Sequence, residues 1–277
     1  MPLPYVNIPD GHLGPVPIHP FGVLVATGVL IGTSLMVRRG ERYGIPRAKF
    51  ESFISYSLVF GFVLSHVLDE LMYRPREALH NPLQLLKIWA GISSYGGIIG
   101  GVVGALVYGF VKKEKILPYL EHVGAIFPIA WIFGRSGCSV AHDHIGRESA
   151  SFLAVNFPGG PRFDLGLLEL MATIPIAGLM LWFASKPRRP GQILALVALV
   201  YAPIRFGLDA LRAVDIANPD ARYFGFTPGQ WLSIALLFVG VALLVHARGK
   251  PPLAPVPKRP AEPPPDPMVP PPEPTQP

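Results

Sequence analysis

The chain has 277 residues, of which 50% are hydrophobic and 15% are charged, and its formal net charge is +6. A soluble globular domain has about 25% charged residues, so this composition excludes an ordinary water-soluble globule, and it also excludes a disordered or collagen-like chain. One cysteine excludes a disulfide framework. Lys and Arg residues lie in short clusters between apolar runs rather than in a basic stripe, so we expect no nucleic-acid partner.

Seven apolar stretches follow one another along the chain. They cover residues 21–37, 50–71, 88–111, 117–133, 165–184, 191–211 and 228–245. A helix of about 20 apolar residues crosses a bilayer, so the sequence predicts an all-α, polytopic integral membrane protein with about seven transmembrane helices. Pro128 and Pro203 interrupt the fourth and sixth stretches, which a packed bundle tolerates. We expect residues 1–250 to form one transmembrane domain.

The distribution of Lys and Arg predicts the orientation, because these residues accumulate on the cytoplasmic side of a membrane protein. Fifteen of the 24 basic residues follow the first, third and fifth stretches or lie in the tail, 8 fall in the other connections, and Arg205 lies inside the sixth stretch. This bias predicts an N-terminus outside and a C-terminus inside. The long polar connections at residues 138–164 and 212–227 then face outward, where we expect the functional site.

The last 27 residues, 251–277, contain 14 prolines. So many prolines prevent helix formation and leave no apolar face to bury, which predicts a disordered, Pro-rich cytoplasmic tail.

Four arginines lie inside or beside the apolar stretches: Arg135, Arg147, Arg205 and Arg212. Each needs a partner or a function, because an arginine at membrane depth is energetically costly. Arg205 and Arg212 are about two helical turns apart and share a face. A guanidinium binds two phosphate oxygens at once, so such arginines suit a phospholipid head group. Snorkelling to the interface, or an ion pair between Arg205 and Asp209, is the alternative interpretation.

Residues 134–147, GRSGCSVAHDHIGR, contain the densest group of ionisable and nucleophilic side chains in the chain. The glycines Gly134, Gly137 and Gly146 would let a ligand approach the backbone closely. Cys138 is either a covalent nucleophile or, more commonly for a lone cysteine, a small buried residue.

The run His142-Asp143-His144 raises the question of a metal site. Alternate residues of a helix point in different directions, and no further histidine or cysteine cluster completes a coordination shell. We therefore expect no metal.

A second patch of small residues, GISSYGGIIGG, spans residues 91–101. Gly97 and Gly101 have the GxxxG spacing that is typical of close helix packing. Tyr95 precedes the pair Gly96-Gly97, and it is either an interfacial residue or a proton acceptor or lipid-binding hydroxyl.

Together these motifs resemble the prolipoprotein diacylglyceryl transferase family of polytopic bacterial enzymes. Residues 134–147 are similar to the family pattern Gly-Arg-x-Gly-Asn-x-x-x-x-Glu-x-x-Gly-Arg, and residues 93–97 to its Ser-x-His-Gly-Gly turn. Residues 205–212 resemble its Arg-Phe-x-x-Glu-x-x-Arg pattern. Agreement at His19-Pro20, Glu169 and Gly229-Gln230 extends the resemblance over about residues 15–246.

The resemblance implies an enzyme that transfers the diacylglyceryl group of phosphatidylglycerol to the thiol of the lipobox cysteine of a prolipoprotein, the first step of bacterial lipoprotein maturation. Glycerol 1-phosphate is released and no cofactor is implied. The enzyme would lie in the bacterial inner membrane, with the bilayer, phosphatidylglycerol and the lipobox peptide as partners and the active site toward the outer leaflet. Arg135 would position the phosphate, and Arg212 would stabilise charge on the leaving phosphate. The other substrate-binding residues that it implies are Gly96, Gly97, Gly134, Gly137, Gly146, Arg147, Arg205, Asp209 and Phe21.

The chain departs from the family pattern at four positions. Tyr95 replaces His, Cys138 replaces Asn, Asp143 replaces Glu and Phe21 replaces Tyr. Tyrosine, with an unperturbed pKa of about 10 against about 6.5 for histidine, is the poorer base at neutral pH.

His142 or His144 would then act as the base in place of the family histidine that Tyr95 replaces. The predicted catalytic set is Arg135, Arg212, Tyr95, Asp143 and His142. The alternative is a catalytically altered or inactive relative that binds phospholipid without diacylglyceryl transfer. A small-solute transporter is disfavoured because the two halves of the chain show no self-similarity.

Overall fold

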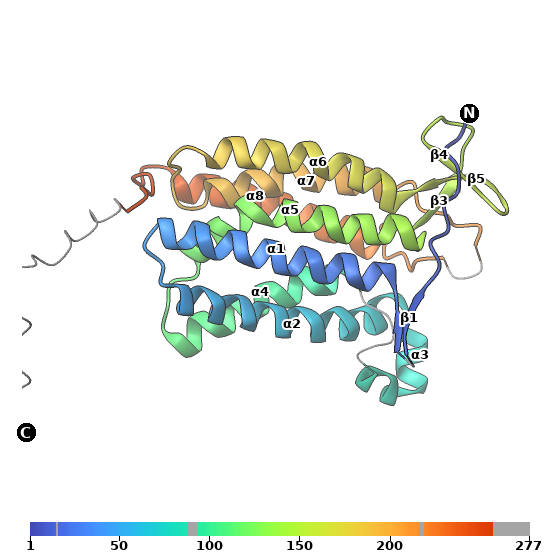
Figure 1. Cartoon of the computed structure of the whole chain (residues 1–277), viewed down its shortest axis with the longest axis horizontal. Helices are drawn as coiled ribbons and strands as arrows, with labels where there is room; N and C mark the ends of the chain where they lie inside the picture. The colour runs from blue at the N-terminus through green and yellow to red at the C-terminus, as the bar shows by residue number, and fades with distance from the viewer. Residues whose placement is uncertain (15, 88–92, 217–218, 257–277) are drawn as a thin grey trace, which may run out of the picture.

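The computed structural model describes residues 1–14, 16–87, 93–216 and 219–256. Seven helices in this part are long and apolar enough to cross a membrane, which confirms the predicted polytopic helical fold. They run side by side in one bundle (Figure 1). These helices are α1 (Pro20–Arg42), α2 (Arg47–Tyr73), α4 (Ser94–Lys112), α5 (Leu117–Ala141), α6 (Leu165–Ala184), α7 (Gln192–Asp209) and α8 (Pro228–Ala247).

The helix bounds differ from the predicted stretches at two places that matter. Helix α5 continues to Ala141 rather than ending at residue 133, so Arg135 and Cys138 lie on the helix and not in a loop. The third predicted stretch begins at residue 88, but residues 88–92 lie outside the described part and α4 begins at Ser94. Pro128 and Pro203 lie within continuous helices.

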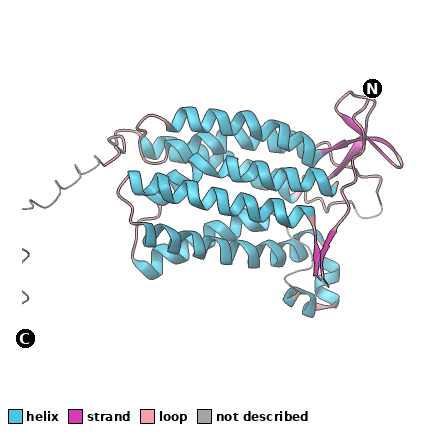
Figure 2. Ribbon diagram, in the orientation of Figure 1, coloured by secondary structure: helices cyan, strands magenta, loops and turns pink. Residues whose placement is uncertain are grey.

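Short elements outside the seven helices cover one end of the bundle, on the right in Figures 1 and 2. They comprise the hairpin of β1 (Gly11–Leu13) and β2 (Val16–Ile18), helix α3 (Pro75–His80), the 3-10 helix η1 (Pro82–Leu86), and an antiparallel sheet with the order β3-β5-β4, formed by β3 (Ile145–Glu148), β4 (Ala154–Phe157) and β5 (Gly160–Asp164). The all-α prediction missed these strands because each is only three to five residues long.

Glycines bring α2 and α4 into close contact, but not the two that the GxxxG spacing indicated. A Cβ at Gly96 would lie 2.6 Å from the carbonyl oxygen of Leu64, and Gly100 and Gly104 meet the α2 backbone in the same way. At Gly97 and Gly101 the nearest atoms would lie 3.9 and 4.0 Å away, which is ordinary contact. The close-packing face is therefore one residue earlier in register than predicted.

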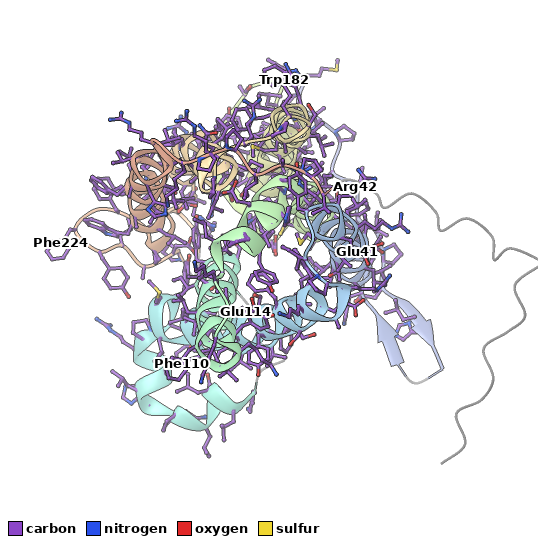
Figure 3. All side chains as sticks on the ribbon, turned by 90° about the vertical axis from the view of Figure 1, so that its left-hand side faces the viewer. Glu41, Arg42, Phe110, Glu114, Trp182 and Phe224 are labelled. Atoms are coloured by element: carbon purple, nitrogen blue, oxygen red, sulfur yellow. The ribbon has the colours of Figure 1, made fainter. Side chains whose placement is uncertain are left out.

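The apolar core lies toward the other end of the bundle, on the left in Figure 1, and Figure 3 views the molecule from this end. Phe50, Phe53 and Tyr119 pack as a buried aromatic cluster, with the Phe53 and Tyr119 rings stacked 4.9 Å apart. The buried carboxylate of Glu121 accepts hydrogen bonds from the Gly191 and Ile193 amides at 2.8 and 3.2 Å. It thereby satisfies amides at the start of α7 that have no partner within the helix.

The Pro-rich segment begins against this same end. The amide of Leu253 donates to the carbonyl of Arg188, and the amide of Val256 donates to that of Arg42. The rest of the predicted tail, residues 257–277, lies outside the described residues. At the edge of the bundle Trp182 is 66% exposed, as expected of a side chain that faces lipid (Figure 3).

Candidate active site

Four of the seven long helices, α1, α4, α6 and α8, begin at the end that carries the short strands, and the last three begin with a side-chain cap. The side chains of Ser93, Asp164 and Thr227 accept hydrogen bonds from backbone amides in the first turns of α4, α6 and α8. A Ser, Asp or Thr directly before an apolar run is a strong helix start signal, so local sequence fixes these positions. The helix N-termini carry partial positive charge, which favours an anion at this end.

Arginines and carboxylates alternate in one connected series at this end, which we call the ion-pair chain: Arg135, Glu169, Arg205, Asp209, Arg212 and Asp220. Glu169 bridges the first two arginines, with its Oε1 atom 3.0 Å from Arg135 Nε and its Oε2 atom 3.5 Å from Arg205 Nη1. The residues come from α5, α6, α7 and the loop after α7, so only the folded bundle brings them together.

Asp209 continues the chain toward the surface. Its Oδ1 atom lies 2.9 Å from Arg205 Nη2 and 2.7 Å from Arg212 Nε. Arg212 Nη1 in turn lies 2.8 Å from Asp220 Oδ2. The ion pair that was the alternative interpretation for Arg205 is therefore present, and it links Arg205 to Arg212. Both predicted arginines, Arg135 and Arg212, belong to one chain at one end of the bundle.

The ion-pair chain runs from a buried end to an accessible one. The Arg135 and Arg205 side chains are 2% and 1% exposed, whereas those of Arg212 and Asp220 are 13% and 24% exposed. Burial lowers the pKa of Arg212, but the neighbouring Asp209 and Asp220 outweigh it and raise the pKa above its ordinary value. The three arginines are balanced by three carboxylates, which explains how so many charges are tolerated here.

The guanidinium of Arg205 keeps unused hydrogen-bonding capacity. Among the described residues, none of its three nitrogens has a partner with hydrogen-bond geometry, although two of them lie near carboxylates. Buried donors normally find partners. Buried donors that are not well aligned with their neighbouring carboxylates are suited to a bound anion.

Arg135 contacts residues from two further parts of the chain and one residue of its own helix. Its Nη2 atom donates to the hydroxyl of Ser94 at 3.0 Å, its Nη1 atom lies 3.5 Å from His144 Nε2, and its guanidinium stacks 4.5 Å from the Trp131 ring. Arg135 is thus the point at which α4, α5 and the loop after α5 meet.

Tyr95 packs against Arg205 of the ion-pair chain. The Arg205 guanidinium stands 5.1 Å above its ring, and its hydroxyl is buried without a hydrogen-bond partner among the described residues. A Cβ at Gly229 would lie 2.7 Å from the ring carbon that carries this hydroxyl, so only glycine leaves room for it. The geometry makes the Tyr95 hydroxyl available as a hydrogen-bond donor.

The three glycines of residues 134–147 have different surroundings. A Cβ at Gly137 would lie 2.9 Å from the ring of Phe21, and one at Gly146 would lie 2.8 Å from Phe163. These two glycines therefore permit protein packing, and their contact with substrate stays a prediction. Gly134 faces open space, since no atom of the described residues lies within 4 Å of a Cβ placed there.

His142 is enclosed by protein, which argues against the proton-acceptor role that we predicted for it. Its Nδ1 atom lies 2.6 Å from Asp164 and its Nε2 atom 3.1 Å from the carbonyl oxygen of Val6. Its ring stacks on Tyr5 at 4.2 Å. Burial raises the pKa of Asp164, although the Leu167 amide and His142 partly offset this rise. His142 joins the N-terminal segment to the start of α6.

Asp143 and His144 form a separate pair on the Arg135 side, with 2.6 Å between Asp143 Oδ1 and His144 Nδ1. Cys138, Asp143 and His144 each have one potential metal-ligand atom, and these three atoms lie within 4.8 Å of one another. The sequence argument against a metal did not predict this group. However, Arg135 Nη1 lies within 3.6 Å of the thiol and the imidazole, and this fixed positive charge repels a divalent cation. We keep the proposal of a metal-free site.

Arg147 does not lie with Arg135, because the Arg147 side chain is exposed on β3 while that of Arg135 is buried. Its backbone has the more visible role. The Arg147 amide donates to Leu211 at 2.8 Å and the Ala213 amide donates to Ile145 at 3.2 Å. These bonds attach the loop of Arg212 to the loop that follows α5, which explains how two distant motifs share one site.

Sequence reasoning did not select several residues that support the ion-pair chain. Tyr201 and Trp131 donate to Glu169, and Thr227 donates to Asp209. Glu169 had the clearest signal, because it is the only carboxylate in an otherwise apolar stretch of residues 165–184. Tyr201 had none, since tyrosine is common in membrane helices, and the signal at Thr227 indicated only a helix cap.

Comparison with known proteins agrees with the motif resemblance. Residues 11–246 match the profile of the family described as prolipoprotein diacylglyceryl transferase. Proteins named phosphatidylglycerol–prolipoprotein diacylglyceryl transferase are similar along most of the chain. The one from Bordetella bronchiseptica is 31% identical over 251 residues, 87% of this chain and 95% of the relative. Those from Chromohalobacter salexigens and Xanthomonas oryzae pv. oryzae are each 28% identical, over 86% and 90% of this chain and 91% and 94% of the relative.

Proposed function

We propose that this chain, which belongs to the prolipoprotein diacylglyceryl transferase family, transfers the diacylglyceryl group of phosphatidylglycerol to a prolipoprotein at the ion-pair chain. It is a transferase embedded in a bacterial membrane. The acceptor is the thiol of the lipobox cysteine, and glycerol 1-phosphate leaves. The observation that carries this assignment is the ion-pair chain, in which Arg135 on α5 and Arg205 on α7 are buried and Arg212 in the loop after α7 lies nearer the surface.

The phosphate of phosphatidylglycerol binds between Arg135 and Arg205 in this proposal. Both guanidiniums are buried, and among the described residues no nitrogen of Arg205 has a partner with hydrogen-bond geometry. The leaving phosphate gains one negative charge as the ester bond breaks, so preorganised guanidiniums stabilise the transition state more than the ground state. Arg212 lies nearer the surface and holds the glycerol phosphate as it leaves. Neither a metal nor an organic cofactor is required.

The site faces the outer leaflet of the inner membrane in this proposal. The bias of basic residues toward the left-hand end of Figure 1 supports a cytoplasmic position for that end. The ion-pair chain lies at the opposite end, near the depth at which phospholipid head groups of the outer leaflet are found. A lipobox cysteine held near the outer surface reaches this end without crossing the bilayer.

The test is transfer by the purified full-length protein in phosphatidylglycerol vesicles with a fluorescent lipobox peptide. We expect a thioether product by mass spectrometry, and no product in vesicles of phosphatidylethanolamine alone. Arg135→Ala should abolish transfer, while the exposed Arg76→Ala at the same end should not change it. Lipid binding without product in the wild type would instead favour the non-catalytic relative, which the similarity to named transferases does not favour.

A further inference from the structure

We propose that His144 is the general base that removes the proton from the acceptor thiol, and that Asp143 is the positioning residue that orients it. This inference rests on the proposed transfer reaction and names the proton acceptor for it. The pair lies in the loop between α5 and β3, on the Arg135 side of the site.

The neighbours of His144 fix which of its nitrogens is a lone-pair acceptor. An ionised carboxylate only accepts hydrogen bonds, so Nδ1, which lies 2.6 Å from Asp143 Oδ1, carries the hydrogen. A guanidinium only donates, so Nε2, which lies 3.5 Å from Arg135 Nη1, presents its lone pair. This is the arrangement in which a carboxylate holds an imidazole in the tautomer that a general base needs.

The other candidate bases near Arg135 are either engaged by protein groups or buried. His142 uses both ring nitrogens within the protein. Glu169 Oε1 pairs with Arg135 and also accepts hydrogen bonds from Trp131 and Tyr201, so its lone pairs are already used. The Tyr95 hydroxyl sits beyond Arg205, buried beside Gly229. His144 has a side chain that is 19% exposed, and its Nε2 lone pair faces the Arg135 Nη1 donor at the long distance of 3.5 Å. In this proposal Arg135 turns that donor to the bound phosphate, which frees the lone pair for the thiol.

The position of His144 also suits the reaction, because its Nε2 atom and the phosphate site share Arg135. The charged and titratable groups that face the imidazole are Asp143 on its own loop and Arg135 and Cys138 on α5. A thiol that hydrogen-bonds to Nε2 is then adjacent to the phosphate ester that Arg135 holds. Deprotonation and displacement take place side by side.

The transfer step moves one proton and exchanges a C–O bond for a C–S bond. The thiol proton passes to Nε2, and the electron pair of the S–H bond stays on sulfur. The sulfur attacks the glyceryl carbon that bears the phosphate ester, forming the C–S bond. The C–O bond breaks, and its electron pair goes to the phosphate oxygen of the leaving glycerol 1-phosphate. The imidazolium returns its proton to that phosphate or to water, which leaves His144 neutral.

The experiment compares two acceptors in phosphatidylglycerol vesicles that contain the full-length protein. One is a lipobox peptide with its cysteine, and the other carries selenocysteine, whose selenol ionises far more readily than a thiol and needs no base. The variants are His144→Asn, His142→Asn and His80→Asn, the last an exposed control in α3. A positioned base contributes about 100- to 10,000-fold to a rate.

We expect His144→Asn to lose at least about 100-fold with the cysteine peptide and to recover to within about tenfold of the wild type with the selenocysteine peptide. His80→Asn should match the wild type with both. Undiminished activity of His144→Asn with the cysteine peptide overturns the proposal, and so does a selenol-recoverable defect that appears in His142→Asn instead. Equal loss with both peptides, in a variant that keeps the wild-type melting temperature, also overturns it. If His144→Asn does not fold, His144→Gln takes its place.

Two further readouts distinguish base catalysis by His144 from a structural role of Asp143 and from metal binding. Asp143→Asn should lower kcat and displace the acid limb of the kcat/KM pH profile for the cysteine peptide, because a lost orienting carboxylate changes the protonation of the base. A purely structural role of Asp143 leaves that limb in place and contradicts the positioning role. Wild-type activity should survive EDTA, whereas loss that Zn²⁺ restores would assign Cys138, Asp143 and His144 to a metal and overturn the proposal. Wild type that converts neither peptide refutes the transfer reaction itself.

Discussion

Replacing Glu169 by Gln tests whether the ion-pair chain is a balanced set of charges. The change keeps the shape of the side chain and an oxygen that accepts from Trp131 and Tyr201, but it removes the negative charge between Arg135 and Arg205. Removing one partner of a buried ion pair costs about 3–5 kcal/mol, since an uncompensated charge remains in the interior. Glu169 is fully buried, so we expect this range to apply.

The expected result is a lower melting temperature and a higher affinity for anions. At about 2–4 °C per kcal/mol, the loss corresponds to roughly 6–20 °C. A carboxylate about 4 Å from a guanidinium contributes about 4 kcal/mol at an effective dielectric constant of about 20, so the variant should bind glycerol 1-phosphate about tenfold more tightly or better. Differential scanning fluorimetry in detergent, with and without glycerol 1-phosphate, measures both effects. Ligand at about 100 times its Kd should restore about 2.7 kcal/mol.

The matched control is Glu148→Gln, the same substitution in the exposed pair with Arg162, where the Glu148 side chain is 68% exposed. Such exposed pairs contribute about 0–1 kcal/mol, so its melting temperature should barely change. The reasoning would be refuted if Glu169→Gln had the same melting temperature as Glu148→Gln and bound glycerol 1-phosphate no more tightly than the wild type. Glu169 would then not be the counterion of the two buried arginines.

Three other outcomes follow from the geometry. Arg135→Lys keeps the charge but cannot reach Glu169, Ser94 and His144 together, so kcat/KM for transfer should fall about 100- to 1,000-fold, and near-normal kinetics would disprove the need for a guanidinium. Gly229→Ala places a methyl group against the Tyr95 ring and should cost about 1–3 kcal/mol in thermal unfolding, whereas Gly134→Ala enters open space and should leave stability unchanged; equal melting temperatures would contradict this packing. The Arg162 side chain lowers the pKa of the Asp215 carboxyl from its ordinary 3.8, so the contact between β5 and the Arg212 loop stabilises that loop at pH values above the ordinary pKa. The contact is lost as the pH falls through the lowered pKa, so proteolysis near residue 215 should increase only in strong acid, and Arg162→Ala should be cleaved at all pH values.

The sequence by itself determined the class of fold, because membrane insertion depends on local properties. Apolar length alone predicted each of the seven helices, and the start of α6 at Leu165 and of α8 at Pro228 agreed with the predicted positions. The residues before them, Asp164 and Thr227, are caps that act within one helical turn. The motif pattern was also sufficient to indicate the family, since spacing within a motif survives substitution.

Only the tertiary structure decided how the charged residues are shared. Whether Arg205 binds a lipid or a carboxylate depends on Glu169, which is 36 positions away in sequence on another helix. The choice between His142 and His144 could not be made from their order in the chain. His142 faces Asp164 and Val6, whereas His144 faces Arg135. The two differ because the chain turns at His142 itself, the left-handed residue that ends α5.

The register of the α2–α4 contact was likewise undecided by sequence, since Gly96, Gly97, Gly100 and Gly101 offer two overlapping small-residue faces. Long-range electrostatics and helix rotation depend on all neighbours at once. A pattern in one segment therefore fixed where a helix lies along the chain, and the packed bundle fixed which way its polar groups face.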